Sequence, residues 1–130
     1  MLTLLVGGSL EERKGLVQQY ADKGHIILNK YRIMKELTRD NETHDKIFHR
    51  YVDVFEGVIL SKLLEGRFKV VIDTPNIDLL RRGELTQVGR MFGVDVIAHE
   101  VNPDHKQDGY FAPIMEEGYK KIVKGLDYIG

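Results

Sequence analysis

The chain opens with an apolar run, Leu2–Val6, that leads through two adjacent glycines into a polar stretch able to form a helix. An apolar run without alternation is typical of a strand covered on both faces. Leu16, Val17 and Tyr20 then share one face of a predicted helix that ends at Gly24. A strand followed at once by a helix begins a βαβ unit, so this segment favours a parallel sheet.

Strand and helix signals go on alternating along the chain. Apolar runs predict strands at residues 25–28, 68–72 and 94–101, and helical periodicity predicts helices at residues 31–37, 77–92 and 112–124. A long helix is expected to run through Leu64, with Asn41 or Thr43 as its cap. Seven apolar residues have the spacing of its core face: Ile47, Phe48, Tyr51, Val54, Phe55, Val58 and Ile59.

These elements predict one α/β domain over residues 1–130, without internal repeats. Its sheet is expected to be mainly parallel, with four or five strands and helices on both faces. Leu2–Val6 and residues 68–72 should lie near the centre of the sheet, because both runs are apolar without alternation.

Composition excludes several classes of protein. The chain has 19 basic and 20 acidic residues, so its charge gives no support for a general nucleic-acid or membrane-surface protein. It has no cysteine, which excludes disulfides, thiolate metal sites and thiol nucleophiles. No apolar run approaches the roughly 20 residues of a membrane span, and no signal-peptide pattern precedes the first strand. The sequence therefore predicts a cytoplasmic protein without a membrane partner.

The two glycines stand where loops of the pattern GxxxxGK[ST] wrap backbone N–H groups around phosphate. If Gly7 is the first glycine of the pattern, Glu12 stands at the second one. Arg13 then stands at the lysine position and Lys14 at the hydroxyl position. If Gly8 is the first glycine, Lys14 stands at the lysine position of the pattern. Both registers lack the second glycine and the hydroxyl that holds Mg²⁺.

Four segments carry a resemblance to a known family: LLVGGSLEERKGLVQQY, HIILNKYR, VVIDTPNIDLLRR and FGVDVIAHEV. In their order along the chain they resemble the small P-loop kinases of the polynucleotide 5′-kinase type, including phage kinase domains. The resemblance favours the register that begins at Gly7. It implies a P-loop kinase-like fold and an ATP-dependent phosphoryl-transfer ancestor, with Gly7, Gly8, Arg13 and Lys14 at the cofactor site.

The phosphate loop departs from the family pattern in its charges. Lys14 puts a cation where the family's hydroxyl would hold Mg²⁺. Glu11 and Glu12 place carboxylates where free N–H groups and the helix dipole attract phosphate. These two acids either occupy the anion site themselves or are ordinary first-turn acids of a helix.

Two further departures concern catalysis. The family has an Asp after its second strand that acts as a general base, worth about 10²–10⁴ in rate, and this chain has NKYR at residues 29–32. The family's lid supplies arginines, worth about 10³–10⁵ in rate, and residues 102–109 offer only Lys106. Phosphoryl transfer is therefore expected to be inefficient.

Three charged residues around the third predicted strand are candidates for the site. Asp73 follows the carboxyl end of that strand, the edge at which open α/β sheets bind ligands, and it is either a catalytic residue or a turn cap before Pro75. Arg81 and Arg82 match arginines on the family's next helix. They are candidate substrate-binding residues, or else a solvated helix face with Glu84 as a local partner.

The histidines do not predict a metal site. His44 and His49 are five residues apart, so they do not share a helix face as ligands at i and i+4 would. His99 and His105 are predicted to be polar surface residues. Several aromatic residues near the C-terminus, among them Tyr110 and Phe111, pack in the core or form a partner or dimer surface.

Two functions follow from these residues. In the first, the chain is a degenerate kinase-fold protein that binds a protein, nucleic-acid or nucleotide partner without efficient phosphoryl transfer and without a cofactor. In the second, it is a divergent nucleoside or polynucleotide kinase, a phosphotransferase that uses ATP and Mg²⁺. Its site is then rebuilt from Arg13, Lys14, Asp73, Arg81 and Arg82. The first function is favoured because several catalytic features are missing together. Both leave homo-oligomerisation open.

Overall fold

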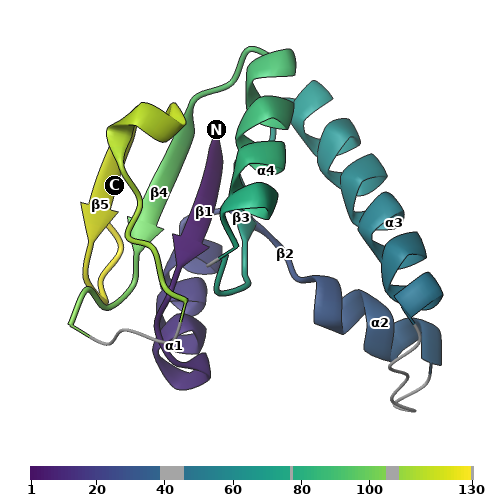
Figure 1. Cartoon of the computed structure of the whole chain (residues 1–130), viewed down its shortest axis with the longest axis horizontal. Coiled ribbons are helices and arrows are strands. Elements are labelled where there is room, and N and C mark those ends of the chain that lie inside the picture. Colours follow the sequence, from purple (N-terminus) through teal and green to yellow (C-terminus); the bar gives the residue numbers. More distant parts are fainter. Residues whose placement is uncertain (39–45, 77, 105–108, 130) are drawn as a thin grey trace.

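The computed structural model describes residues 1–38, 46–76, 78–104 and 109–129 (Figure 1). In chain order, the elements are β1 (Leu2–Val6), α1 (Leu10–Asp22), β2 (Ile26–Leu28), α2 (Lys30–Thr38), α3 (Lys46–Glu65), β3 (Val70–Ile72), α4 (Leu79–Met91), β4 (Val96–Glu100), a 3₁₀ turn (Met115–Glu117) and β5 (Lys121–Lys124). Among the described residues, no helix is both long and apolar enough to cross a membrane.

The five strands form one parallel sheet in the order β2-β3-β1-β4-β5. β1 lies at the centre, with Leu2 opposite Val70 of β3 on one side and opposite Val96 of β4 on the other. All five residues of β1 are buried, as an apolar run without alternation requires. The prediction of an α/β fold with a parallel sheet is confirmed, and so are the central positions of β1 and β3.

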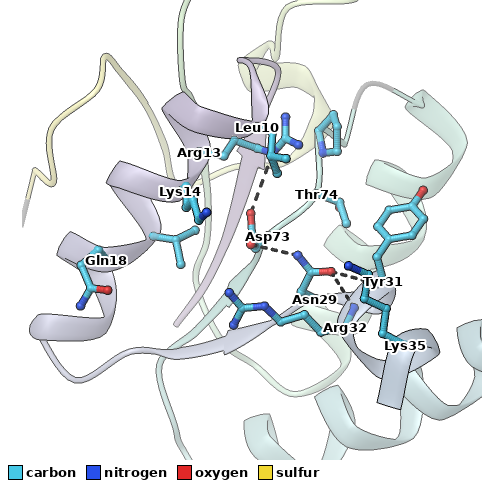
Figure 2. Close-up of a pocket in the computed structure, with 12 residues that line it drawn as sticks. Leu10, Arg13, Lys14, Gln18, Asn29, Tyr31, Arg32, Lys35, Asp73 and Thr74 are labelled. Carbon is cyan, nitrogen blue, oxygen red and sulfur yellow. Dashed lines mark hydrogen bonds and ion pairs between the residues drawn. The ribbon is translucent and has the colours of Figure 1, made fainter. Parts of the chain in front are cut away.

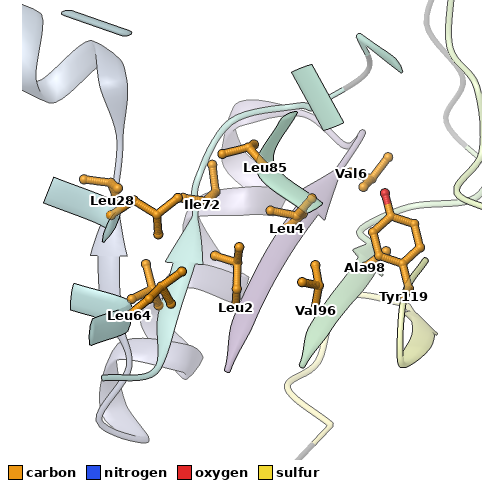
Figure 3. Close-up of a cluster of buried hydrophobic side chains, with 12 residues drawn as sticks. Leu2, Leu4, Val6, Leu28, Leu64, Ile72, Leu85, Val96, Ala98 and Tyr119 are labelled. Carbon is orange, nitrogen blue, oxygen red and sulfur yellow. The ribbon is translucent and has the colours of Figure 1, made fainter. Parts of the chain in front are cut away.

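Helices cover both faces of the sheet. On one face, α1 packs Leu16, Val17 and Tyr20 against Leu5 and neighbouring strand residues. On the other face, α3 and α4 cover a larger apolar cluster (Figure 3). That cluster draws on all the strands and on both helices, and its members include Leu2, Leu4, Leu28, Leu60, Leu64, Ile72, Leu85, Val96, Ala98 and Tyr119.

The C-terminal segment is not the predicted helix. Residues 112–124 form a 3₁₀ turn, which ends at Gly118 in the left-handed conformation with φ of 104°, and then strand β5. Ile122 of β5 pairs with Ala98 of β4 in parallel register. A left-handed glycine stops helix growth, and the apolar pair Ile122 and Val123 extends the sheet edge.

The predicted core face of α3 is also wrong. Five of its seven residues are half or more exposed and Ile59 is 40% exposed, whereas the buried residues of the helix are Val52, Glu56, Leu60 and Leu64. These four residues repeat every four positions, which is the row that faces the sheet. The periodicity correctly predicted an apolar stripe on this helix, but it did not show which side of the helix packs against the sheet. The predicted caps, Asn41 and Thr43, are outside the described residues.

His99 is fully buried, so the prediction that it lies on the surface is wrong. Its strand, β4, is covered on both faces. The imidazole is held at both nitrogens, with Nδ1 2.6 Å from the Tyr20 hydroxyl and Nε2 2.8 Å from the Gly125 carbonyl oxygen. Burial lowers the pKa of His99, and the hydrogen bond to Gly125 partly opposes that shift.

Candidate functional site

A loop of only three residues, 7–9, joins β1 to α1. Gly7 and Gly8 have φ of 71° and 78°, and the Gly7 N–H donates to the Pro75 carbonyl at 2.7 Å. A Cβ on Gly7 would lie 2.8 Å from the Tyr110 ring, and one on Gly8 would lie 2.6 Å from a Val101 methyl. Only glycine fits at either position, because other side chains already lie against the loop.

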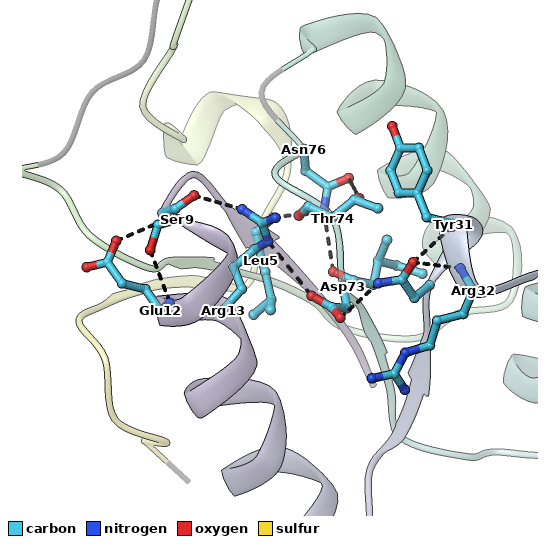
Figure 4. A network of polar contacts seen from close by, with 12 residues as sticks. Leu5, Ser9, Glu12, Arg13, Tyr31, Arg32, Asp73, Thr74 and Asn76 are labelled. Carbon is cyan, nitrogen blue, oxygen red and sulfur yellow. Dashed lines mark hydrogen bonds and ion pairs between the residues drawn. The ribbon is translucent and has the colours of Figure 1, made fainter. Parts of the chain in front are cut away.

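The N-terminus of α1 is closed by a capping box (Figure 4). The Ser9 hydroxyl accepts from the Glu12 N–H at 3.1 Å, and Glu12 Oε1 accepts from the Ser9 N–H at 2.9 Å. The other carboxylate oxygen of Glu12 accepts from the Asn102 amide at 2.5 Å. A carboxylate therefore occupies the place at a helix N-terminus where anions otherwise bind, whereas Glu11 is exposed.

Arg13 folds back onto the loop from inside α1. Its backbone N–H donates to the Ser9 carbonyl as a helical bond, and its guanidinium donates to the Gly8 carbonyl at 2.7 Å. Arg13 Nε lies 3.9 Å from Asp73 Oδ1, which makes an ion pair without a hydrogen bond. Burial lowers the pKa of the Arg13 guanidinium, and Asp73 partly offsets that shift.

Asp73 joins α1 to the start of α2. Its Oδ2 accepts from the Asn29 amide at 3.0 Å, and Asn29 Oδ1 accepts from the backbone N–H groups of Tyr31 and Arg32. Asn29 thus caps the first turn of α2 while it binds the carboxylate. The turn after β3 is held instead by Asn76, whose amide donates to the Leu5 carbonyl at 2.8 Å.

Beside this network lies a pocket of about 550 Å³ between α1 and α2 (Figure 2). Leu10 and Val17 of α1 contribute apolar wall, and Tyr31 of α2 contributes an aromatic ring. The charged side chains that line it are Arg13, Lys14, Arg32, Lys35 and Asp73. Four cations and one carboxylate give the pocket a positive potential, which favours an anionic ligand.

The cations of the pocket differ in how they are held. Arg13 is bound by Gly8 and Asp73, whereas Lys14, Arg32 and Lys35 are exposed and form no ion pair within the described residues. The described residues include no group of three or more His, Asp or Glu side chains that could hold a metal ion. The pocket is therefore suited to bind an anion directly through exposed cations.

A neighbouring hollow of about 400 Å³ shares Tyr31, Thr74 and Pro75 with this pocket. Its charged side chains are Lys30, Asp53, Glu56, Asp78 and Arg81. Lys30 Nζ lies 2.7 Å from Asp53 Oδ1, and Arg81 forms an ion pair with Glu56. Because its cations are already paired, this hollow has less capacity for an anion than the pocket beside it.

The structure brings some of the predicted site residues together and separates others. Arg13, Lys14 and Asp73 line the pocket, while Arg81 lies in the neighbouring hollow. Arg82 is fully buried, and its guanidinium donates to Glu117 at 2.9 and 3.0 Å and to the Phe111 carbonyl at 2.6 Å. Arg82 thus holds the C-terminal segment against α4. The predicted lid residue Lys106 is outside the described residues.

Sequence reasoning missed the contribution of α2 to the pocket. Residues 29–32 stood out only as the place where a base was absent, yet Asn29 caps the helix that carries Tyr31, Arg32 and Lys35. The signal was the spacing of these residues, since Arg32 and Lys35 are three apart on one helix face. This spacing could have revealed a second cationic helix face, in addition to the one that carries Arg13 and Lys14.

Comparison with known proteins identifies the fold. No protein-family model matches the sequence, and no curated protein matches it. A solved structure from Chloroflexus aurantiacus, described as "a putative kinase", matches with a TM-score of 0.66 at 9% sequence identity. The match covers 97% of this chain and 84% of that one. At this identity the likeness concerns the fold, and the chain has a kinase-like α/β fold.

Proposed function

We propose that this chain is a degenerate P-loop protein, of the polynucleotide 5′-kinase type, that binds a phosphate-bearing ligand without efficient phosphoryl transfer. The observation that carries the proposal is the bond from the Ser9 N–H to Glu12 Oε1 in a loop of only three residues. A phosphate-binding loop needs free N–H groups around an open hollow, and this loop uses its own carboxylate instead.

Three contacts support the absence of a triphosphate site at the loop. The Gly7 N–H donates to Pro75, and the side chains of Tyr110 and Val101 lie against the two glycines. A bound triphosphate would have to displace these groups and also approach the Glu12 carboxylate. Lys14, at the position of the hydroxyl, would in addition repel the Mg²⁺ that accompanies ATP.

The pocket between α1 and α2 supports the other half of the proposal. Its exposed cations, Lys14, Arg32 and Lys35, offer charge-assisted hydrogen bonds to phosphate oxygens. Tyr31, which is 55% exposed, offers a ring on which a nucleobase can stack. A ligand that matches these groups has a phosphate joined to a base, as in a nucleotide or the 5′-phosphorylated end of a nucleic acid.

Calorimetric titration tests the binding half. We expect adenosine 5′-monophosphate and a short 5′-phosphorylated DNA to bind the wild-type protein, and unphosphorylated adenosine to bind at least tenfold more weakly. The double variant Arg32→Glu with Lys35→Glu should lose the phosphate-dependent binding. A matched control, Lys121→Glu with Lys124→Glu, makes the same charge change on β5 and should bind as the wild type does. If both double variants lost binding equally, the loss would result from the change in net charge, and the pocket would not be the binding site.

A transfer assay tests the other half. The wild type, Arg13→Ala and Asp73→Ala should all show no appreciable transfer of the ATP γ-phosphate to nucleosides or to short DNA or RNA. Robust turnover by the wild type that both substitutions abolish would establish a divergent kinase instead.

A further inference from the structure

Helix α3 turns a broad apolar stripe away from its own domain. The exposed side chains include Tyr51 at 62%, Val54 at 62%, Phe55 at 50% and Val58 at 56%. Ile47 and Ile59, at 63% and 40%, extend the same stripe. In Figure 1, α3 lies at the edge of the molecule, and the exposure of these side chains places them on its outward side. We call these six residues the α3 stripe.

The inner side of α3 is less apolar than the stripe. It buries Val52, Leu60 and Leu64 against the sheet, but it also buries Glu56, which is 2% exposed and pairs with Arg81 of α4. A helix that serves only its own domain places its widest apolar stripe against the core and its charges outside. α3 does the reverse, which indicates a second packing surface.

The spacing of the stripe fits a helix as its occupant. Ile47, Tyr51, Val54 and Val58 follow one another at intervals of four, three and four residues. This is the a and d pattern with which two helices pack along a shared seam. Gly57 lies beside the seam, and nothing outside its own stretch of helix lies within 4 Å of the place where its Cβ would stand, so a second backbone can approach there.

We propose that the occupant is α3 of a second copy of this chain, in an antiparallel two-fold dimer. Opposing Tyr51 to Val54 of the other copy places Ile47 opposite Val58, so every layer is apolar on both sides. This register also places the exposed Arg50 near Phe55 of the other copy, where a cation can rest on an aromatic ring. Lys46, Arg50 and Lys62 are exposed cations that flank the stripe, and no two of them oppose each other in this register.

The area of the stripe agrees with a homodimer. Its six side chains expose roughly 600 Å² per copy, if a fully exposed side chain of this kind presents about 150 to 220 Å². Two copies would then bury about 1,200 Å², which is the lower limit of a specific, stable interface. The contact requires no other protein, because an isologous interface is complementary to itself.

Sedimentation equilibrium between about 1 and 100 μM tests the proposal. We expect the wild type to dimerise in that range, with little change in 1 M NaCl, because the interface is apolar. Val54→Glu should be monomeric at 100 μM and keep the wild-type circular dichroism. The matched control Leu80→Glu, at an apolar residue of α4 that is 73% exposed, should still dimerise. A wild type that stays monomeric at 100 μM would overturn the proposal.

Cysteine cross-linking tests the register, and it does not depend on how Val54→Glu folds. The chain has no cysteine, so Ile47→Cys and Val58→Cys, which oppose each other in this register, each introduce a single thiol. With a short bismaleimide, a mixture of the two variants should give far more cross-linked dimer than either variant alone, and Leu80→Cys should give none. Efficient cross-linking of Leu80→Cys, or none in the mixture, would contradict the α3 interface.

Discussion

The loop after β1 and the pocket between α1 and α2 lie at the same edge of the sheet, yet they present different polar groups to the solvent. At the loop, two backbone donors are already satisfied: the Gly7 N–H by the Pro75 carbonyl and the Ser9 N–H by Glu12. In the pocket, Arg32 and Lys35 are exposed cations. The edge of a sheet therefore offers an anion site only where its polar groups are left for the ligand.

Arg13 connects the two regions and marks the boundary between them. Its guanidinium donates to the Gly8 carbonyl of the loop, and the same residue lines the pocket. One helix thus presents a closed N-terminus and an open cationic side. Kinase-like architecture is compatible with both, so the architecture alone does not decide where a phosphate binds.

The largest effect on stability should come from adding a side chain at the loop, where other side chains already lie against the glycines. Gly8→Ala places a Cβ 2.6 Å from Val101 at a φ of 78°, and we expect it to lower the free energy of unfolding by about 3 kcal/mol. Arg32→Ala, on the rim of the pocket, should change it by less than about 0.5 kcal/mol. Urea denaturation measures both. Equal stability of the two variants would show that the loop is not held as tightly as we describe.

A smaller effect distinguishes the two acids of the first turn of α1. Glu12→Ala removes the capping-box acceptor and should lower the free energy of unfolding by about 1 kcal/mol. Glu11→Ala removes only an exposed charge near the helix dipole, at a cost of about 0.3 kcal/mol. Thermal unfolding of the two variants checks this difference. If Glu11→Ala proved the more damaging, Glu12 would not be the group that closes the loop.

The smallest effect is a control at the other end of α1, remote from both regions. His25 is buried against Tyr20 and Tyr128, with neither ring nitrogen hydrogen-bonded within the described structure. Burial lowers the pKa of His25, and nearby Lys69 lowers it further. The unfolded state then takes up the proton first, so stability should fall as the pH drops below about 6.5. His25→Phe should reduce that loss while ligand binding at neutral pH stays unchanged. An unaltered pH profile of stability would show that His25 does not contribute.

The sequence predicted the sheet well, because the strands carry their own signal. Leu2–Val6 is apolar at every position, and only a central strand of a parallel sheet is buried in that way. Two of the failures have a common cause. The orientation of α3 and the burial of His99 depend on which neighbours cover them, and periodicity contains no information on that.

The candidate site was predicted in part for a similar reason. Asp73 and Lys14 could be placed because they follow directly on a strand or begin a helix. The role of Arg82 could not be foreseen, because its partner Glu117 is 35 residues away in a segment predicted to be a helix. The α2 cations were missed because their site exists only where two helices face each other (Figure 2).

Calorimetric titration of the wild-type protein with ATP, with and without Mg²⁺, tests the central claim most directly. If the loop is closed and anions bind only in the cationic pocket, ATP should bind at most a few-fold more tightly than adenosine 5′-monophosphate, and Mg²⁺ should not strengthen its binding. Micromolar binding that depends on Mg²⁺ would contradict the account, since it would require an open phosphate-binding loop after β1.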